Sequence, residues 1–203
     1  MSHNIFKVCT DSLILKDFCN VSQKDTLVEL CCGEGYILKE LHNNIKLGIG
    51  IDINPNFLPL WKNIKESVPN IEFILSNIKL AHNIIRKKVD KVICNPPYYK
   101  KSSFRISPNF YRAISRTEIL MNLEDVFKIS SEILKSNGKL FLIHLSQRLT
   151  EIFIYSQKYN FAVKRLKPVI FSSKQHDEVK LVLIELSFND EKSYLKFEIP
   201  IYI

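Results

Sequence analysis

The sequence predicts an α/β fold, with a mostly parallel sheet covered by helices on both faces. Two observations support this prediction. Short apolar runs alternate with helix-like stretches along the 203 residues, and such alternation is typical of parallel sheets. The late run 178–187 is apolar at both alternating sets of positions, so both of its faces should be buried. In sheets of this kind, ligands bind beyond the carboxyl ends of the strands.

The expected elements alternate in order along the chain. Apolar runs of strand length predict strands at 26–30, 47–51, 71–75, 89–94, 139–146, 161–170 and 178–187. Helical periodicity predicts helices at 11–19, 36–42, 56–68, 79–87, 122–135 and 148–159. The helix at 122–135 has the clearest limits. Asn122 is the expected N-cap, with Asp125 completing a capping box, and Asn137-Gly138 is the expected stop.

Composition favours one domain over residues 1–203, which includes a helical N-terminal segment at 1–25. No uncharged apolar run reaches about 18 residues, and the N-terminus lacks the pattern of a secretory signal. The five cysteines are odd in number and have no CxxC spacing, and the five histidines are scattered. We therefore expect a cytoplasmic protein with reduced thiols, without a membrane span or a metal site. The oligomeric state, monomer or weak homodimer, is left open.

Two strand ends carry the features of a nucleoside site. The segment Glu29–Gly35 (ELCCGEG) follows the first strand, and Asp52 ends the second. Glycines allow a tight turn and a close ligand, and an acid at that place commonly binds ribose hydroxyls. A dinucleotide is disfavoured, because residue 38 is leucine rather than a third glycine, and because Glu34 would repel a pyrophosphate. A cationic cofactor such as S-adenosylmethionine fits better. A tight turn followed by a surface aspartate is the alternative reading.

Asn95-Pro96-Pro97-Tyr98 follows the fourth strand directly. The two prolines fix two φ angles and remove two backbone donors, which leaves a rigid turn with free carbonyls. The Asn95 side chain and the Pro96 carbonyl can accept the two hydrogens of a planar amine, while Tyr98 stacks on its ring. The alternative is a proline-stiffened loop with a capping asparagine. No covalent step is needed, so Cys32 and Cys94 are expected to be buried apolar residues rather than nucleophiles.

The stretch 99–116 is expected to be a long basic loop that binds substrate. Its cations alternate with aromatic residues, a composition that suits a single-stranded RNA loop: Lys100, Lys101, Arg105, Arg112 and Arg116. Arg165 and Lys174 could extend this surface. The net charge of +8, from 29 basic and 21 acidic residues, also favours a polyanionic partner. A solvated, flexible basic loop is the alternative.

These motifs together resemble the S-adenosylmethionine-dependent class I methyltransferases. The resemblance implies a Rossmann-like, mostly parallel seven-stranded sheet with an antiparallel last strand. Asn95-Pro96-Pro97-Tyr98 resembles the catalytic signature shared by DNA adenine, RNA base and protein glutamine methyltransferases. The cofactor contacts implied by the resemblance are Glu29, Cys31, Gly33, Gly35, Asp52, Ile53, Asn77, Ile78 and Asn95.

A narrower resemblance covers roughly residues 10–203. The chain is similar to the bacterial tRNA(Val)-specific adenine methyltransferases, which modify the exocyclic nitrogen of the adenine next to the anticodon, at position 37. The segments that carry this similarity are 10–18, 95–101, 114–120, 122–126, 134–138, residues 144 and 148–149, and 179–185. It implies a tRNA partner. The alternatives are another enzyme with the same signature, acting on DNA, ribosomal RNA or a protein glutamine, and a noncatalytic RNA-binding subunit.

Two residues depart from the family pattern. Cys31 stands where glycine is usual, and Asn77 stands where an aspartate contacts the adenine of the cofactor. We expect the turn to survive if φ at Cys31 is negative, because cysteine is small. Asn77 can still offer a carbonyl acceptor. The expected consequence is weaker cofactor binding rather than an inactive site.

Overall fold

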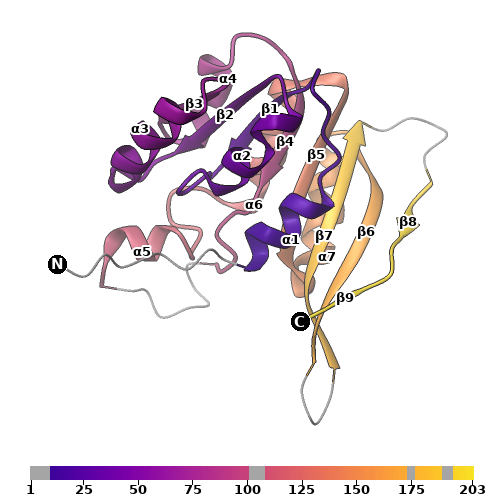
Figure 1. Cartoon of the computed structure of the whole chain (residues 1–203). Coiled ribbons are helices and arrows are strands. Elements are labelled where there is room, and N and C mark those ends of the chain that lie inside the picture. Colours follow the sequence, from indigo (N-terminus) through magenta and orange to yellow (C-terminus); the bar gives the residue numbers. More distant parts are fainter. Residues whose placement is uncertain (1–9, 101–107, 173–176, 189–193) are drawn as a thin grey trace.

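The computed structural model describes residues 10–100, 108–172, 177–188 and 194–203 (Figure 1). Within these residues nine strands form one sheet, in the order β3-β2-β1-β4-β5-β7-β6-β8, with β9 also pairing with β6. The strands are β1 (Thr26–Leu30), β2 (Leu47–Asp52), β3 (Ile71–Leu75), β4 (Val89–Cys94), β5 (Leu134–Leu145), β6 (Phe161–Ser172), β7 (Asp177–Phe188), β8 (Lys196–Phe197) and β9 (Ile201–Tyr202).

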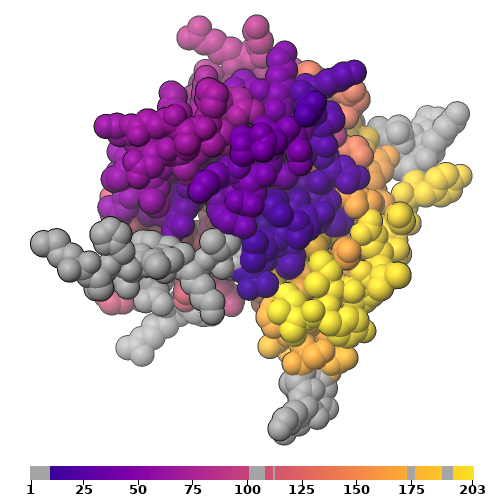
Figure 2. Space-filling model, viewed as in Figure 1, coloured from indigo at the N-terminus to yellow at the C-terminus, as the bar shows by residue number. Residues whose placement is uncertain are grey.

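The sheet is mostly parallel, as predicted. Strands β1 to β5 pair in parallel, whereas β7 is antiparallel to both β5 and β6. The antiparallel late strand is therefore confirmed. The seven expected strands are all present, and two strands of two residues each extend the β6 edge. In the space-filling view the yellow C-terminal residues lie at the lower right, and the purple and magenta residues of the region around α3 and α4 lie at the upper left (Figure 2).

Helices cover both faces of the sheet. The α-helices are α1 (Thr10–Phe18), α2 (Tyr36–Leu41), α3 (Leu58–Ser67), α4 (Ala81–Ile84), α5 (Phe110–Ile114), α6 (Leu123–Ile133) and α7 (Leu149–Lys158). Short 3₁₀ turns are η1 (His42–Asn44), η2 (Pro55–Phe57), η3 (Ile78–Leu80) and η4 (Ser146–Arg148). One apolar cluster joins the sheet to α4, α6 and α7, and the other joins it to α1 and α2.

Strand β7 passes between these two clusters. Val182, Ile184 and Leu186 belong to one, whereas Leu181 and Leu183 belong to the other. This arrangement confirms that both faces of the strand are buried from residue 181 to 186, whereas residues 178–180, which were also predicted to be buried, are exposed. Strands β1 to β4 end in register, so the loops that follow them lie side by side at one edge of the sheet.

Several differences from the sequence prediction are local. The helix expected at 79–87 is a 3₁₀ turn followed by the four-residue α4, and the expected stop at Asn137-Gly138 lies within β5. The stretch 99–116 is not structureless, because it contains α5, whose Ala113 and Ile114 are buried. Helix α6 ends at Ile133 rather than Lys135, because Leu134 is already extended and pairs with Val89. Strand β5 therefore begins earlier than expected. The start of α6 is as predicted: Asn122 Oδ1 accepts from Asp125 N at 2.9 Å, and Asp125 Oδ2 accepts from Asn122 N at 2.8 Å.

Candidate active site

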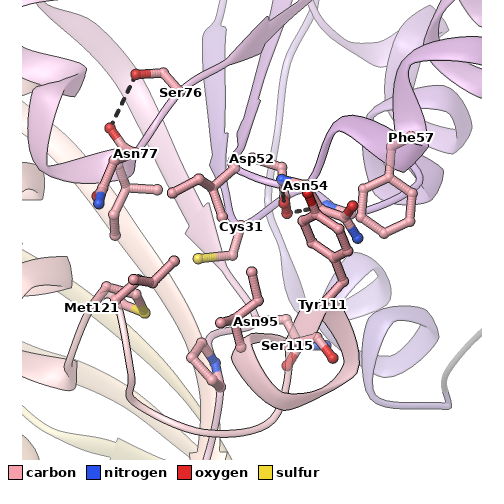
Figure 3. Close-up of a pocket in the computed structure, with 16 residues that line it drawn as sticks. Cys31, Asp52, Asn54, Phe57, Ser76, Asn77, Asn95, Tyr111, Ser115 and Met121 are labelled. Atoms are coloured by element: carbon pink, nitrogen blue, oxygen red, sulfur yellow. Dashed lines mark hydrogen bonds between the residues drawn. The ribbon is translucent and has the colours of Figure 1, made fainter. Parts of the chain in front are cut away.

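Two adjoining hollows lie at the carboxyl edge of the sheet. We call one the Asp52 hollow, since residues after β2 and β3 line it, and the other the Tyr98 hollow, since the turn after β4 and helix α1 line it. Both are lined by Cys31, Gly33 and Asn95. Figure 3 shows Cys31 between Asp52 and Asn95. The three sequence motifs therefore meet at one place.

The glycine loop after β1 rests on two stacked aromatic rings. Gly33 and Gly35 have φ angles of +52° and +78°, which favour glycine. A Cβ at Gly35 would lie 2.5 Å from the Phe73 ring. That ring stacks on Trp61 with centroids 5.1 Å apart, and Trp61 Nε1 donates to the Gly33 carbonyl at 2.8 Å. Gly35 therefore shapes the loop, and it lines neither hollow.

Cys31 does not have the negative φ that its small side chain led us to expect. Its φ is +58°, in the left-handed region that costs an L-residue about 1–2 kcal/mol. The turn is thus kept in the conformation that glycine would adopt, and the cysteine side chain is accommodated at a cost in backbone strain. Its sulfur faces the Asp52 hollow (Figure 3).

We predict that Cys31→Gly stabilises the fold by about 0.5–1 kcal/mol, because relief of this strain exceeds the added entropy of the unfolded chain. Urea unfolding monitored by circular dichroism measures the difference. Asn160→Gly is the matched control, because Asn160 is exposed, has the same φ of +58°, and is a residue type that tolerates it better. An equal gain in both variants, or a loss at Cys31, would contradict the strain account.

The Asp52 carboxylate accepts hydrogen bonds from backbone amides of two loops, the one after β1 and the one after β2. Its Oδ2 accepts from Gly33 N and its Oδ1 accepts from Asn54 N, both at 2.9 Å. Burial raises the pKa of Asp52, and these backbone hydrogen bonds oppose the rise. The carboxylate is therefore fixed in orientation and partly desolvated, and each oxygen keeps further acceptor capacity toward the hollow.

Glu29 and Asn77 differ in whether their side-chain oxygens have hydrogen-bond donors. Glu29 is 4% exposed, and its Oε2 has no hydrogen-bond partner among the described residues. Burial raises the pKa of Glu29 well above its usual range. A cation bound in the Tyr98 hollow would offset this desolvation. Asn77 Oδ1 already accepts from Lys79 N at 3.0 Å as the cap of η3, so its carbonyl has one remaining lone pair for a ligand.

The turn after β4 is packed against helix α1. Pro96 and Pro97 are buried. The Tyr98 hydroxyl lies 2.8 Å from both Asn95 Oδ1 and Asp11 Oδ2, so it has two acceptors for one hydrogen. Asn95 Nδ2 donates to Ser12 Oγ at 3.3 Å. The side chains of the turn are thus held in place by an N-terminal helix about 85 residues earlier in the chain.

His144 lies beneath Tyr98, with ring centroids 5.3 Å apart and planes at 52°. It is completely buried, and its Nε2 has no hydrogen-bond partner in the described part of the chain. Burial, and then the charge of Arg148, lower the pKa of His144 to about 3. The imidazole is therefore neutral at physiological pH and supports the Tyr98 ring as an uncharged group.

This pKa predicts a loss of stability on acidification. As the pH falls below about 6.5, His144 becomes protonated in the unfolded chain. In the folded protein it stays neutral until about pH 3, so acid favours the unfolded chain. The free energy of unfolding should fall by about 1 kcal/mol per pH unit between pH 6 and 5 from this group alone. Denaturant unfolding across that range should show a flatter dependence for His144→Asn than for the wild type. His82→Asn, at an exposed histidine, is the control. Parallel curves for wild type and His144→Asn would contradict the prediction.

The residues expected to bind RNA fall into three groups. Arg116 is exposed and lines the Tyr98 hollow, and Lys100 is exposed and pairs with Glu151 at 2.9 Å. Arg165 is turned inward: its guanidinium pairs with Glu185 and Glu198 and lies 4.2 Å from the Phe18 ring centroid, so it ties α1 to the sheet. Lys101, Arg105, Lys174 and the side chain of Arg112 lie outside the described residues.

The sequence did not identify the residues that cover the hollows. Tyr111, Ile114 and Met121 line the Asp52 hollow, and Asp11 and Ser12 line the Tyr98 hollow. The proximity of Tyr111 to the turn at Asn95 in the sequence is a signal for this role, but the sequence prediction places the aromatic residues of 99–116 on an RNA surface instead. In the described ranges, no group of three or more His, Cys, Asp or Glu could hold a metal, and no helix has the length and hydropathy to span a membrane.

Comparison with known proteins gives a consistent picture. A family model described as "Methyltransferase domain" matches residues 22–185. A tRNA1(Val) (adenine(37)-N6)-methyltransferase of Porphyromonas gingivalis is 31% identical over 99 residues, which are 49% of this chain and only 37% of that protein. A protein of the same name from Trichodesmium erythraeum is 23% identical over 97% of this chain and 84% of its own length. The resemblance to these enzymes seen in the sequence is thereby confirmed.

Solved structures share the fold. A structure titled as a "predicted O-methyltransferase" from Agrobacterium tumefaciens superposes with a TM-score of 0.67, over 95% of this chain and 87% of that one, at 15% identity. At this identity the similarity shows the architecture alone. The Rossmann-like sheet expected from the sequence is thus confirmed.

Proposed function

We propose that this chain, which belongs to the methyltransferase domain family, transfers a methyl group from S-adenosylmethionine to the exocyclic amine of an adenine in tRNA. The single observation that carries the proposal is the position of Asn95. It stands where a hollow suited to a nucleoside meets a hollow suited to a planar base. The proposed target is the adenine beside the anticodon of a tRNA(Val), as the names of the relatives suggest.

The donor set of the two hollows fits S-adenosylmethionine. Asp52 would accept hydrogen bonds from the ribose hydroxyls, because both of its oxygens are held by backbone donors and the residue lines the Asp52 hollow. Ile53 and Ile78 would contact the adenine ring, with Tyr111 covering it. The unpartnered Glu29 oxygen suits the cationic end of the molecule. When bound, S-adenosylmethionine supplies an electrophilic methyl group on a sulfonium.

Asn95 and Pro96 would activate the target nitrogen. The amine of adenine is a weak nucleophile, because its lone pair is delocalised into the ring. Hydrogen bonds from its two hydrogens to Asn95 Oδ1 and the Pro96 carbonyl oppose that delocalisation and hold the nitrogen in line. Asn95 Oδ1 faces the Tyr98 hydroxyl, which has Asp11 as a second acceptor. The amine can therefore replace the hydroxyl at Asn95 without leaving Tyr98 unsatisfied.

RNA as the polyanionic partner is supported by charge and position. Lys100 and Arg116 are exposed at the two ends of the 99–116 stretch, and Arg116 lines the hollow that holds Tyr98. The net charge of +8 adds a favourable long-range field. Neither feature distinguishes one tRNA from another.

The test is incorporation of a labelled methyl group from S-adenosylmethionine into three substrates offered separately to the pure chain. These are total tRNA from cells that lack the modification, adenine-containing duplex DNA, and a protein extract freed of nucleic acid. Label in tRNA alone is the expected result. Label in DNA or protein instead would overturn the choice of substrate. Tight tRNA binding without label in any substrate would favour a noncatalytic RNA-binding subunit.

A further inference from the structure

We propose that Arg148 is a positioning residue for this reaction: it fixes the catalytic turn against the base of the substrate-binding stretch. The inference rests on the proposed function, because it assigns a role in methyl transfer. Arg148 ends η4, just after strand β5, and is 6% exposed. It lines neither hollow.

The guanidinium of Arg148 contacts three separate segments. Its Nη1 donates to the backbone carbonyl of Tyr98 at 3.2 Å. Its Nη2 lies 3.0 Å from Glu118 Oε1 and 3.0 Å from Glu151 Oε2. Tyr98 belongs to the catalytic turn. Glu118 lies two residues after the 99–116 stretch, and Glu151 lies in helix α7. One buried side chain thus holds the turn, the stretch and the helix at fixed separations.

The segments that Arg148 joins are already paired with each other through the backbone. Tyr99 N donates to the Arg116 carbonyl at 3.0 Å, and Glu118 N donates to the Tyr99 carbonyl at 2.8 Å. These bonds close the base of the 99–116 stretch directly after Tyr98. Glu118 Oε1 also accepts from Leu123 N at 3.0 Å, which ties the same carboxylate to the start of α6. Arg148 therefore connects the two segments, at Tyr98 and at Glu118, between which the 99–116 stretch begins and ends.

Arginine suits this position better than lysine. Its planar fork presents several donors in fixed directions, whereas a lysine ammonium is a single charge on a flexible stem. The charges also balance locally: Arg148 and Lys100 oppose Glu118 and Glu151, with Lys100 Nζ 2.9 Å from Glu151. The exposed cation expected to meet RNA thus belongs to the same ion cluster as the buried one. A displacement of Tyr98 by about 1 Å could cost on the order of 10²-fold in rate.

The test compares Arg148→Lys with Lys139→Met. Lys139 pairs with the buried Glu185 in β7, outside both hollows, so its loss should lower stability alone. For Arg148→Lys we expect kcat to fall about 10²-fold, with the dissociation constant of S-adenosylmethionine, from calorimetry, within about twofold of wild type. For Lys139→Met we expect a lower Tm and an unchanged kcat. The double variant Arg148→Met with Glu118→Gln removes one charge of each sign, and should fold while remaining slow.

Trypsin digestion gives a readout that needs no methyl acceptor. Cleavage within 99–116 should be several-fold faster in Arg148→Lys than in wild type or Lys139→Met, because the base of the stretch opens more often. Unchanged cleavage, or a loss of kcat that merely follows the loss of Tm or of cofactor affinity, would overturn the inference. If the wild type methylates no tRNA, the proposed function fails, and faster cleavage would still establish the structural clamp.

Discussion

Replacement of Asn95 by alanine is expected to reduce methyl transfer by at least about 10³-fold, while the affinity for S-adenosylmethionine changes by less than about threefold. The reason lies in the geometry of the junction. In the proposed arrangement Asn95 Oδ1 would accept from the target amine, whereas Asp52 and Glu29, which line the hollows apart from the turn, would bind the ribose and the cationic end of the cofactor. Single-turnover rates and calorimetry on the same preparation measure the two quantities.

A structural contribution of Asn95 has to be separated from this effect. Its Nδ2 donates to Ser12 Oγ, so the alanine variant also loses a contact with α1. Ser12→Ala removes the same contact and leaves the acceptor oxygen in place, and should therefore retain most of the rate. If Asn95→Ala lost cofactor affinity and rate in equal proportion, or if Ser12→Ala were equally slow, Asn95 would have a folding role instead.

Replacement of Asp52 by alanine is expected to weaken the affinity for S-adenosylmethionine by about 10²-fold or more, since hydrogen bonds to a charged group contribute about 1.5–3 kcal/mol each. Asp52 would accept two such bonds from the ribose. It also holds the Gly33 and Asn54 amides, so its loss loosens the glycine loop. Calorimetry measures the affinity. Asp90→Asn is the control, because Asp90 pairs with Lys135 and accepts from Thr26 N at the start of β1, away from both hollows.

The same carboxylates give the affinity a pH dependence. Burial raises the pKa of Asp52 and of Glu29, so both groups take up a proton at higher pH than ordinary carboxyls do. A protonated Asp52 is a weaker acceptor for the ribose hydroxyls, and a protonated Glu29 loses its attraction for the cationic end of the cofactor. The affinity should therefore fall as the pH is lowered, beginning at a higher pH than ordinary carboxyls would give. In Asp52→Asn, whose affinity is lower from the outset, the part of the fall that is due to Asp52 should be absent. A flat profile in the wild type would contradict the assignment of these carboxylates.

Much of the fold followed from local patterns. Strands β1, β3 and β4 have the predicted limits, because each is a short apolar run bounded by polar or turn-forming residues. Helix α6 is capped by Asn122 as predicted, since a capping box is encoded within four residues. Helix α5 was missed, because five residues carry little periodicity and the helix is stabilised by burial of Ala113 and Ile114 against other segments.

The candidate site was predictable where a motif is contiguous and follows a strand. The glycine loop, Asp52 and the turn at Asn95 meet because parallel strands bring their carboxyl ends to one edge. Long-range partners were not predictable. Arg165 looked like a surface cation, yet Glu185 and Glu198, which hold it inside, are distant in sequence. The positive φ of Cys31 is a property of the loop as a whole, and the residue type argued against it.

The central claim is that Asn95 presents an adenine amine of tRNA to the methyl donor. The most direct measurement is mass spectrometry of nucleosides from unmodified total tRNA after incubation with wild type or Asn95→Ala. The account predicts N6-methyladenosine in one isoacceptor with the wild type, and none above background with Asn95→Ala. A methyl group on another base or another atom, or equal yields from the two proteins, would contradict it.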